Sequence, residues 1–172
     1  MSKEIFLIRH AEKDPVGTLT EAGKQKAREL AAKLPTFERI VSSDSSRTQE
    51  TAELLTNTKP IVDTRAGFYM APPEKSDELN RIAKENNISF LEAVVIFNDP
   101  EVLQGVESKA NALNKLIDEL LSSMPNGTKA LVVSHDLSIS PALKQRGIPL
   151  ESIDFLSGYI INDQGNISTF HP

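Results

Sequence analysis

Two histidines and two arginines are the residues of this sequence best suited to chemistry. Arg9 and His10 directly follow one short apolar run, His135 follows another, and Arg47 lies shortly after a third. Such runs are typical of buried strands. One histidine in such a place is more often structural than catalytic, but two, with an arginine beside one of them, favour a site. Ligands of open α/β sheets bind beyond the carboxyl ends of the strands, so we expect these side chains to meet there.

These residue types together suit phosphoryl transfer. A guanidinium group offers a planar fork of donors that fits phosphate oxygens. A neutral imidazole is a capable nucleophile, and nearby guanidinium charges disfavour its protonation. The combination therefore predicts transfer through a covalent phosphohistidine, with the arginines stabilising charge on the equatorial oxygens. No metal and no cofactor is expected, since the arginines supply the positive charge.

The elements that must position these residues alternate between strands and helices. Strands are expected at 5–8, 39–42, 60–62 and 130–133, with a terminal hairpin of 159–161 and 167–170. Helices are expected at 20–34, about 46–56, 75–86, 90–97 and 106–124, and from about 137 onward. This alternation predicts a single-domain, three-layer α/β/α fold with a mostly parallel sheet and a C-terminal antiparallel hairpin. We expect one domain over residues 1–172, with about 65–104 as a lid over the site.

Composition excludes several other classes of protein. The chain has 172 residues, of which 39% are hydrophobic and 25% charged, which is typical of one globular domain rather than of disorder. The net charge is −5 and the basic residues form no stripe, so a nucleic-acid partner is not expected. The absence of cysteine excludes disulfides and thiolate chemistry. No apolar run is long enough to cross a membrane, and we expect a soluble, cytoplasmic protein. The oligomeric state is not predicted.

Four motifs resemble those of a known family, in the family's order. They are Leu7–Glu12 with Leu19–Gly23, Val41–Ala52, Gly105–Ser108 and Val132–His135. These segments resemble the histidine phosphatase superfamily, which includes cofactor-dependent phosphoglycerate mutases and small phosphohistidine protein phosphatases. In that family the third motif marks the start of a helix. One such motif alone is a weak signal, but four in order make a strong one.

The resemblance implies a role for each matching residue. His10 would be the nucleophile that becomes phosphorylated, Arg9 and Arg47 would hold the phosphoryl group, and His135 would donate a hydrogen bond to it. The family's general acid, usually a glutamate, lies after the second arginine. Glu74 is at about the expected distance.

Two further acidic residues remain alternatives for that role. Glu78 is the second choice in the stretch after Arg47. Asp136 follows the second histidine, where another branch of the family uses a His-Asp pair, and it would then contribute to substrate binding or protonation. Aspartate also caps helices well, so Asp136 could serve only as an N-cap.

The departures from the family pattern favour a compact phosphatase. Ala11 replaces the usual glycine, and Lys13 replaces the usual serine or threonine. Lys13 could bind a second substrate charge, although a solvated loop lysine is more common. Only residues 11–18 separate His10 from Leu19, and the chain has no tryptophan, so the longer substrate loop of the mutases is missing.

The sequence therefore predicts a metal-independent phosphatase that hydrolyses a phosphomonoester or a phosphohistidine. Its partner would be a phosphorylated small molecule or a phosphoprotein. Two alternatives remain, a phosphoglycerate mutase-like phosphotransferase and a phosphate-binding module without turnover.

Overall fold

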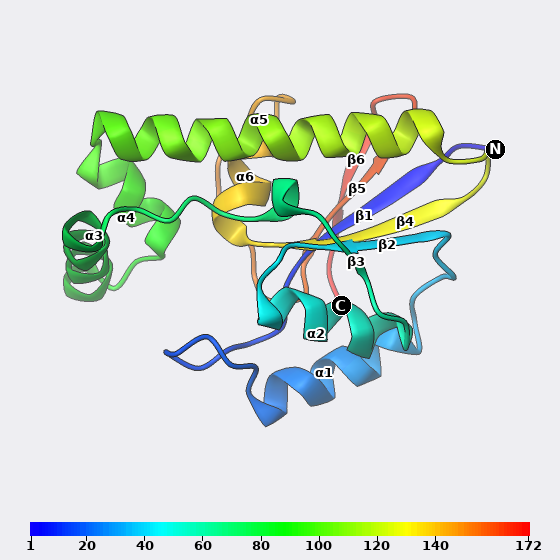
Figure 1. The fold of residues 1–172 in the computed structure, drawn as a ribbon, viewed down its shortest axis with the longest axis horizontal. Helices are drawn as coiled ribbons and strands as arrows, with labels where there is room; N and C mark the ends of the chain where they lie inside the picture. The colour runs from blue at the N-terminus through cyan, green and yellow to red at the C-terminus, as the bar shows by residue number, and fades with distance from the viewer.

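A six-stranded mixed sheet forms the centre of the molecule, which a computed structural model describes over residues 1–172 (Figure 1). The strands are β1 (Glu4–Arg9), β2 (Arg39–Ser42), β3 (Ile61–Val62), β4 (Lys129–Ser134), β5 (Gly158–Asn162) and β6 (Ile167–Phe170). Their order is β3-β2-β4-β1-β5-β6, and the four strands β1, β2, β3 and β4 are parallel to one another. β5 lies antiparallel to β1, and β6 lies antiparallel to β5. The predicted mostly parallel sheet with an antiparallel C-terminal hairpin is confirmed.

Helices cover both faces of this sheet. They are α1 (Glu21–Ala31), α2 (Ser46–Thr56), α3 (Pro73–Asn86), α4 (Phe90–Phe97), α5 (Pro100–Ser123) and α6 (Asp136–Lys144), with a short 3₁₀ turn at Thr64–Ala66. α1 and α2 lie on one face, and α5 and α6 lie on the other (Figure 1). α3 and α4 project beyond the sheet at one end of α5 (Figure 1). None of the helices is both long and apolar enough to span a bilayer.

The central strands are apolar at successive positions because both of their faces are buried. In β1, Ile5 and Leu7 join the core beneath α5 and α6, whereas Phe6 and Ile8 join the core beneath α1 and α2. Side chains alternate between the two faces of a strand, so a strand between two helical layers needs apolar residues on both. The run after Glu4 therefore predicts a central strand correctly.

The structure corrects two predicted helix starts. The helix expected at 106–124 begins at Pro100, because Asp99 caps it by accepting a hydrogen bond from the Val102 N–H. Proline suits the first position of a helix, where its missing N–H has no partner to lose. The Asp-Pro pair is thus a helix start rather than an interruption. Similarly, α3 begins at Pro73 instead of residue 75.

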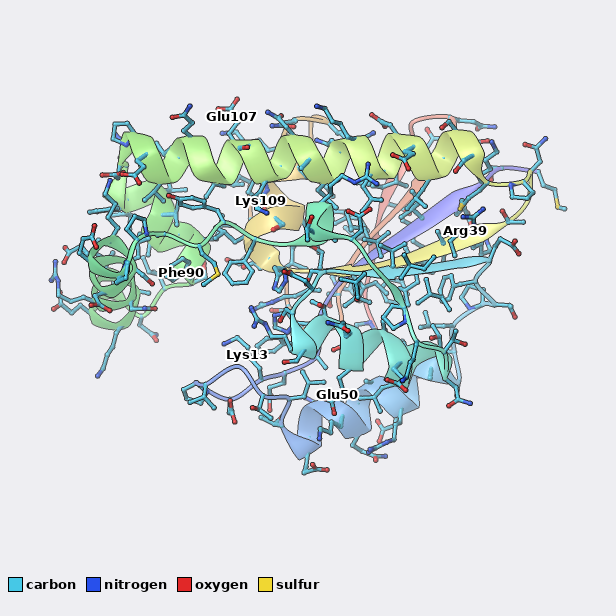
Figure 2. The ribbon with its side chains drawn as sticks, viewed as in Figure 1. Lys13, Arg39, Glu50, Phe90, Glu107 and Lys109 are labelled. Carbon is cyan, nitrogen blue, oxygen red and sulfur yellow. The ribbon has the colours of Figure 1, made fainter.

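The motif expected at the start of a helix lies inside α5 instead. Gly105 leaves room for the ring of Tyr69, which occupies the space where a β-carbon would stand. Glu107 is exposed on the outer side of α5, away from the sheet (Figure 2). Gly105 therefore positions the segment that follows the 3₁₀ turn.

Candidate active site

Both histidines and Arg47 meet at the carboxyl end of the parallel strands. β1 and β4 are neighbours with Arg9 opposite Ser134, so His10 and His135 leave the sheet at the same level. Arg47 lies in the first turn of α2, and its Nε donates to His10 Nε2 at 3.3 Å. The Arg47 Nη2 lies 3.3 Å from His135 Nδ1, and the imidazole centroids are 5.4 Å apart. The structure thus brings together three of the predicted site residues.

The hydrogen bonds of His10 determine which of its nitrogens carries the proton. Nδ1 lies 2.8 Å from the carbonyl oxygen of Ala11. A carbonyl oxygen only accepts, so Nδ1 must be the protonated nitrogen. Nε2 then holds a lone pair, and this lone pair faces the guanidinium of Arg47. His10 is therefore held as the neutral tautomer that can act as a nucleophile through Nε2.

His135 is held in the opposite tautomer. A guanidinium only donates, so His135 Nδ1 accepts from Arg47, and Nε2 carries the proton. Nε2 donates to the Ser43 hydroxyl at 2.9 Å, and this hydroxyl lies 2.6 Å from the Thr48 hydroxyl. The Thr48 hydroxyl donates in turn to the Ser45 carbonyl at 2.9 Å. This chain of donors, which ends on a carbonyl, fixes the orientation of the His135 ring.

Arg9 is held by the segment before β5. Its Nη1 donates to the Ile153 carbonyl at 2.6 Å, and its guanidinium carbon lies 4.1 Å from the centroid of the Phe155 ring. The Phe155 ring is in turn 5.8 Å from the ring of His10. The Nε of Arg9 is buried and has no hydrogen-bond partner. The arginine is therefore held by one hydrogen bond and by the Phe155 ring, and its buried Nε has no protein partner.

Asp136 is tied to the same backbone segment as Arg9. Its Oδ1 accepts from the Ile153 N–H at 2.9 Å, and burial raises the pKa of the half-buried carboxyl group. The N-cap position of α6 is occupied by His135, and Asp136 is the first residue inside the helix. The N-cap interpretation of Asp136 is therefore wrong, because its carboxylate is used by a backbone N–H from another segment.

Phe68 packs against the site from the segment after the 3₁₀ turn. Its ring centroid is 4.7 Å from that of His135, and the Arg47 guanidinium carbon is 5.2 Å from it. The Ser134 and Ser138 hydroxyls donate to the carbonyls of residues 66 and 67 at 2.6 and 2.7 Å, which holds this segment in place. Sequence reasoning missed Phe68, since no motif marks it. It also missed the supporting role of Ser43 and Thr48, although both lie inside the second motif.

The remaining predicted residues lie apart from this cluster. Glu74 is exposed in the first turn of α3 and makes no hydrogen bond or ion pair with the site. Glu78 is paired with Arg81 on the same helix. The third histidine, His171, is exposed. The structure therefore brings neither glutamate into contact with the histidine pair.

Burial and positive charge keep both imidazoles neutral. Burial, together with Arg9 and Arg47, lowers the pKa of His10 to about 3, although the hydrogen bond to Ala11 opposes this. Burial and then the charge of Arg47 lower the pKa of His135 to about 2. Only 2% of His10 and 3% of His135 are exposed. At neutral pH the site thus holds two uncharged imidazoles near two guanidinium groups.

This burial predicts a pH dependence of stability. Histidines of an unfolded chain titrate near pH 6.5, far above the folded pKa values of about 3 and 2. Below about pH 6.5 the unfolded state binds more protons, so the free energy of unfolding should be largest above that pH. It should fall by up to about 1.4 kcal/mol per pH unit for each histidine as the pH decreases.

Urea unfolding measured between pH 7.5 and 5.0 tests this expectation, because unperturbed carboxylates are mostly ionised over that range. The variant His10→Asn removes one of the two groups and should reduce the dependence by about half, whereas His171→Asn should leave it unchanged. Stability that stays constant from pH 7.5 to 5.0 would show that the two imidazoles take up protons in the folded protein at the same pH as in the unfolded chain.

Comparison with known proteins agrees with the motifs. Residues 5–69 match the model of the histidine phosphatase superfamily (branch 1), which confirms the resemblance for the segment that holds Arg9, His10 and Arg47. No curated protein is significantly similar to the chain.

Solved structures of the same fold extend over nearly the whole chain. A phosphoglycerate mutase from Bacillus anthracis has a TM-score of 0.69 at 17% identity, over 99% of this chain and 92% of that one. A mycobacterial glucosyl-3-phosphoglycerate phosphatase complexed with VO3 has a TM-score of 0.65 at 18% identity, over 96% of both chains. The YhfR protein of Bacillus stearothermophilus has a TM-score of 0.67 at 21% identity, over 97% of this chain and 95% of that one. At these identities, the similarity establishes the fold.

Proposed function

We propose that this chain, whose residues 5–69 match the histidine phosphatase superfamily, is a phosphatase that works through a covalent phosphohistidine on His10. The observation that carries this proposal is the tautomer of His10, whose Nε2 lone pair lies 3.3 Å from the Nε of Arg47. A nucleophile directly beside a fixed donor of positive charge is the arrangement that phosphoryl transfer needs.

The proposed reaction has two steps. In the first, the Nε2 lone pair of His10 attacks phosphorus, a P–N bond forms, and the bond from phosphorus to the leaving group breaks. The departing oxygen or nitrogen takes a proton from an acid. In the second, water attacks phosphorus, the P–N bond breaks, and the water proton passes to the conjugate base of that acid. Inorganic phosphate leaves, and His10 returns to its starting state.

Arg9 and Arg47 would stabilise the phosphoryl group in both steps. His135 would join them once its Nδ1 takes up a proton, because the present tautomer leaves Nδ1 an acceptor and uses the Nε2 proton on Ser43. Arg9 uses only one of its N–H groups, on the Ile153 carbonyl, so others would be left to bind phosphoryl oxygens. Arg47 now donates to the two imidazoles, and its donors would turn to phosphoryl oxygens when a substrate binds. Charge-assisted bonds of this kind are about twice as strong as neutral ones, so the arginines would supply the positive charge that the phosphoryl group requires.

Among the acids, Asp136 is better supported by geometry than Glu74 or Glu78. It is half-buried, its pKa is raised by burial, and it bonds the backbone of Ile153, the residue whose carbonyl Arg9 bonds. A raised pKa keeps a carboxyl group protonated closer to neutral pH, as a general acid requires. Glu74 and Glu78 remain alternatives.

The variant Asp136→Asn should separate catalysis from structure, since an amide oxygen can still accept from Ile153. We expect kcat/KM to fall on the order of 100-fold with phenyl phosphate. With p-nitrophenyl phosphate it should fall less than about tenfold, because that leaving group departs without a proton. Glu74→Gln and Glu78→Gln are the matched variants. If either of them shows this leaving-group dependence and Asp136→Asn does not, the acid is that glutamate.

Release of inorganic phosphate tests the function itself. The purified chain is incubated with phenyl phosphate and with a phosphohistidine-bearing protein, without any bisphosphate primer. Hydrolysis predicts stoichiometric phosphate release from at least one of them. A strict requirement for a bisphosphate primer would select the mutase-like phosphotransferase. Tight vanadate binding without phosphate release would select the binding module.

Residues 65–104 are proposed as the cover of this site. Phe68 already lies over His135 and Arg47, whereas α3 and α4 lie farther out beyond the sheet (Figure 1). The partner is then a phosphorylated small molecule or a phosphoprotein that enters beneath this segment. A cytoplasmic location stays a prediction.

A further inference from the structure

The hydrogen bonds around Ser43 allow its oxygen only to accept from His135. The Thr48 hydroxyl lies 2.9 Å from the Ser45 carbonyl and 3.2 Å from the Ser43 carbonyl. Carbonyl oxygens only accept, so Thr48 donates to them and must itself accept from the Ser43 hydroxyl at 2.6 Å. The single proton of Ser43 is thereby used. Its oxygen accepts from the Ser45 N–H at 3.3 Å and, with its second lone pair, from His135 Nε2 at 2.9 Å.

This network fixes the tautomer of His135 without any help from Arg47. Ser43 and Thr48 are fully buried and only 3% of His135 is exposed, and hydroxyls buried in this way keep their protein partners. Nε2 therefore carries the proton on the side of Ser43, while Arg47 donates to Nδ1 on the other side. Both sides of the ring specify the same neutral form, in which Nδ1 is an acceptor.

A bound phosphoryl group conflicts with this acceptor. When Arg47 turns to phosphoryl oxygens, the Nδ1 lone pair of His135 faces oxygens that also only accept, and no hydrogen bond can form between them. A change of tautomer does not resolve the conflict, because Ser43 has no proton left to donate to Nε2. Only a second proton on the ring turns Nδ1 into a donor.

The surroundings of His135 keep this second proton away until an anion binds. Burial and the neighbouring basic groups lower the pKa of the ring, and these groups are Arg9, His10, Lys13 and Arg47. On the helix that follows, the Asp136 carboxylate accepts from the Ile153 N–H. The negative charge of a bound phosphoryl group acts in the opposite direction, because it favours the charged form of a nearby imidazole.

We infer that Ser43 is a positioning residue that couples binding of the phosphoryl group to the uptake of one proton by His135. The proton comes from solvent and binds to Nδ1. The resulting imidazolium donates to Ser43 through Nε2 and to a phosphoryl oxygen through Nδ1. When inorganic phosphate leaves, the proton returns to solvent. This inference rests on the proposed function and adds a proton-linked binding step to it.

Sulfate tests the coupling without any turnover, since it has the shape of phosphate and stays a dianion near neutral pH. Calorimetric titrations in buffers with different enthalpies of ionisation measure the protons taken up per ion bound. Between about pH 5.5 and 8, where imidazoles ordinarily titrate, the uptake should reach about one proton for the wild-type protein. NMR of the imidazole nitrogens should show this proton at His135 Nδ1, and the uptake should persist in His10→Asn.

Two variants remove the constraint in different ways. Thr48→Val frees the proton of Ser43, which can then be donated to His135 Nε2, so the ring can bind the anion as its neutral Nδ1–H tautomer. Ser43→Ala removes the acceptor of the Nε2 proton. In both variants the uptake should fall below about half a proton per sulfate bound. Ser42→Ala is the matched control, since this buried serine donates to the Ser43 carbonyl and forms no hydrogen bond with His135. It should keep the wild-type uptake.

Three results would overturn the inference. They are sulfate binding to the wild-type protein without proton uptake, a proton that arrives at His10 instead of His135, and an uptake that neither Thr48→Val nor Ser43→Ala reduces. An equal loss of uptake in Ser42→Ala would also remove Ser43 from this role.

Failure of the proposed function has a different signature, namely no release of inorganic phosphate from any substrate, which leaves the sulfate measurement unaffected. A protein that binds neither sulfate nor inorganic phosphate would contradict both the inference and the proposed function.

Discussion

Replacement of His10 by asparagine is expected to lower kcat/KM at least about 1,000-fold and to abolish covalent labelling. Loss of a covalent nucleophile leaves only the part of catalysis that comes from binding and electrostatic stabilisation. The asparagine amide can still donate to the Ala11 carbonyl that now binds Nδ1, so the local backbone should be retained. The loss would then report on the missing Nε2 lone pair.

Acid-labile labelling measures this expectation directly. A ³²P-labelled phosphomonoester that the wild-type protein hydrolyses is mixed with each protein, the reaction is quenched with base, and the label is then tested for release by acid. Wild type should carry a label that acid removes, and His10→Asn should carry none. His171→Asn is the matched control, since this histidine is exposed near the C-terminus. A label that persists in His10→Asn would remove His10 from its proposed role.

The fold was predictable because local patterns and tertiary packing agree. β1 and β4 are buried on both faces. Their unbroken apolar runs predict this burial from the sequence alone. Thr20 caps α1 as expected, by accepting from the Gly23 N–H. The helix start at Pro100 was missed because an Asp-Pro pair is typical both of turns and of helix N-termini. Only the packing of α5 against the sheet shows that a helix begins here, with Asp99 as its N-cap.

The candidate site was predictable to a similar degree, for a physical reason. The rule that ligands bind at the carboxyl ends of parallel strands brings His10, Arg47 and His135 together, as the structure has them. Ser43 and Phe68 could not be assigned in this way. The role of Ser43 depends on the imidazole nitrogen of His135 that it faces. The role of Phe68 depends on a segment that two serine hydroxyls hold in place. Neither contact produces a periodic pattern in the sequence.

Asp136 shows most clearly why a residue's type does not determine its use. An aspartate next to a helix start is ordinarily a cap, and the sequence supports that interpretation. In the fold, the segment before β5 offers the Ile153 N–H to this carboxylate and the Ile153 carbonyl to Arg9. Contacts between residues so far apart along the chain are visible only in the folded molecule.

Arg47 provides the second large expected effect, because one side chain holds both imidazoles. Arg47→Ala removes two charge-assisted donors, each worth about 1.5–3 kcal/mol, so kcat/KM should fall about 100- to 10,000-fold. Arg47→Lys keeps the charge without the planar fork and should recover only part of this loss. Arg28→Ala, at an exposed position of α1, should change activity less than about twofold.

A second measurement separates this role from a general loss of folding. The charge of Arg47 lowers the pKa of both His10 and His135, so its removal should raise both values. NMR titration of the imidazole nitrogens in Arg47→Ala should therefore show both rings gaining protons at a higher pH than in the wild-type protein. Arg47→Lys should lie between the two, since it retains a cation at the same position. If activity falls in Arg47→Ala while both histidines titrate as in wild type, the guanidinium does not lie between the imidazoles in solution, and the site would have to be built without it.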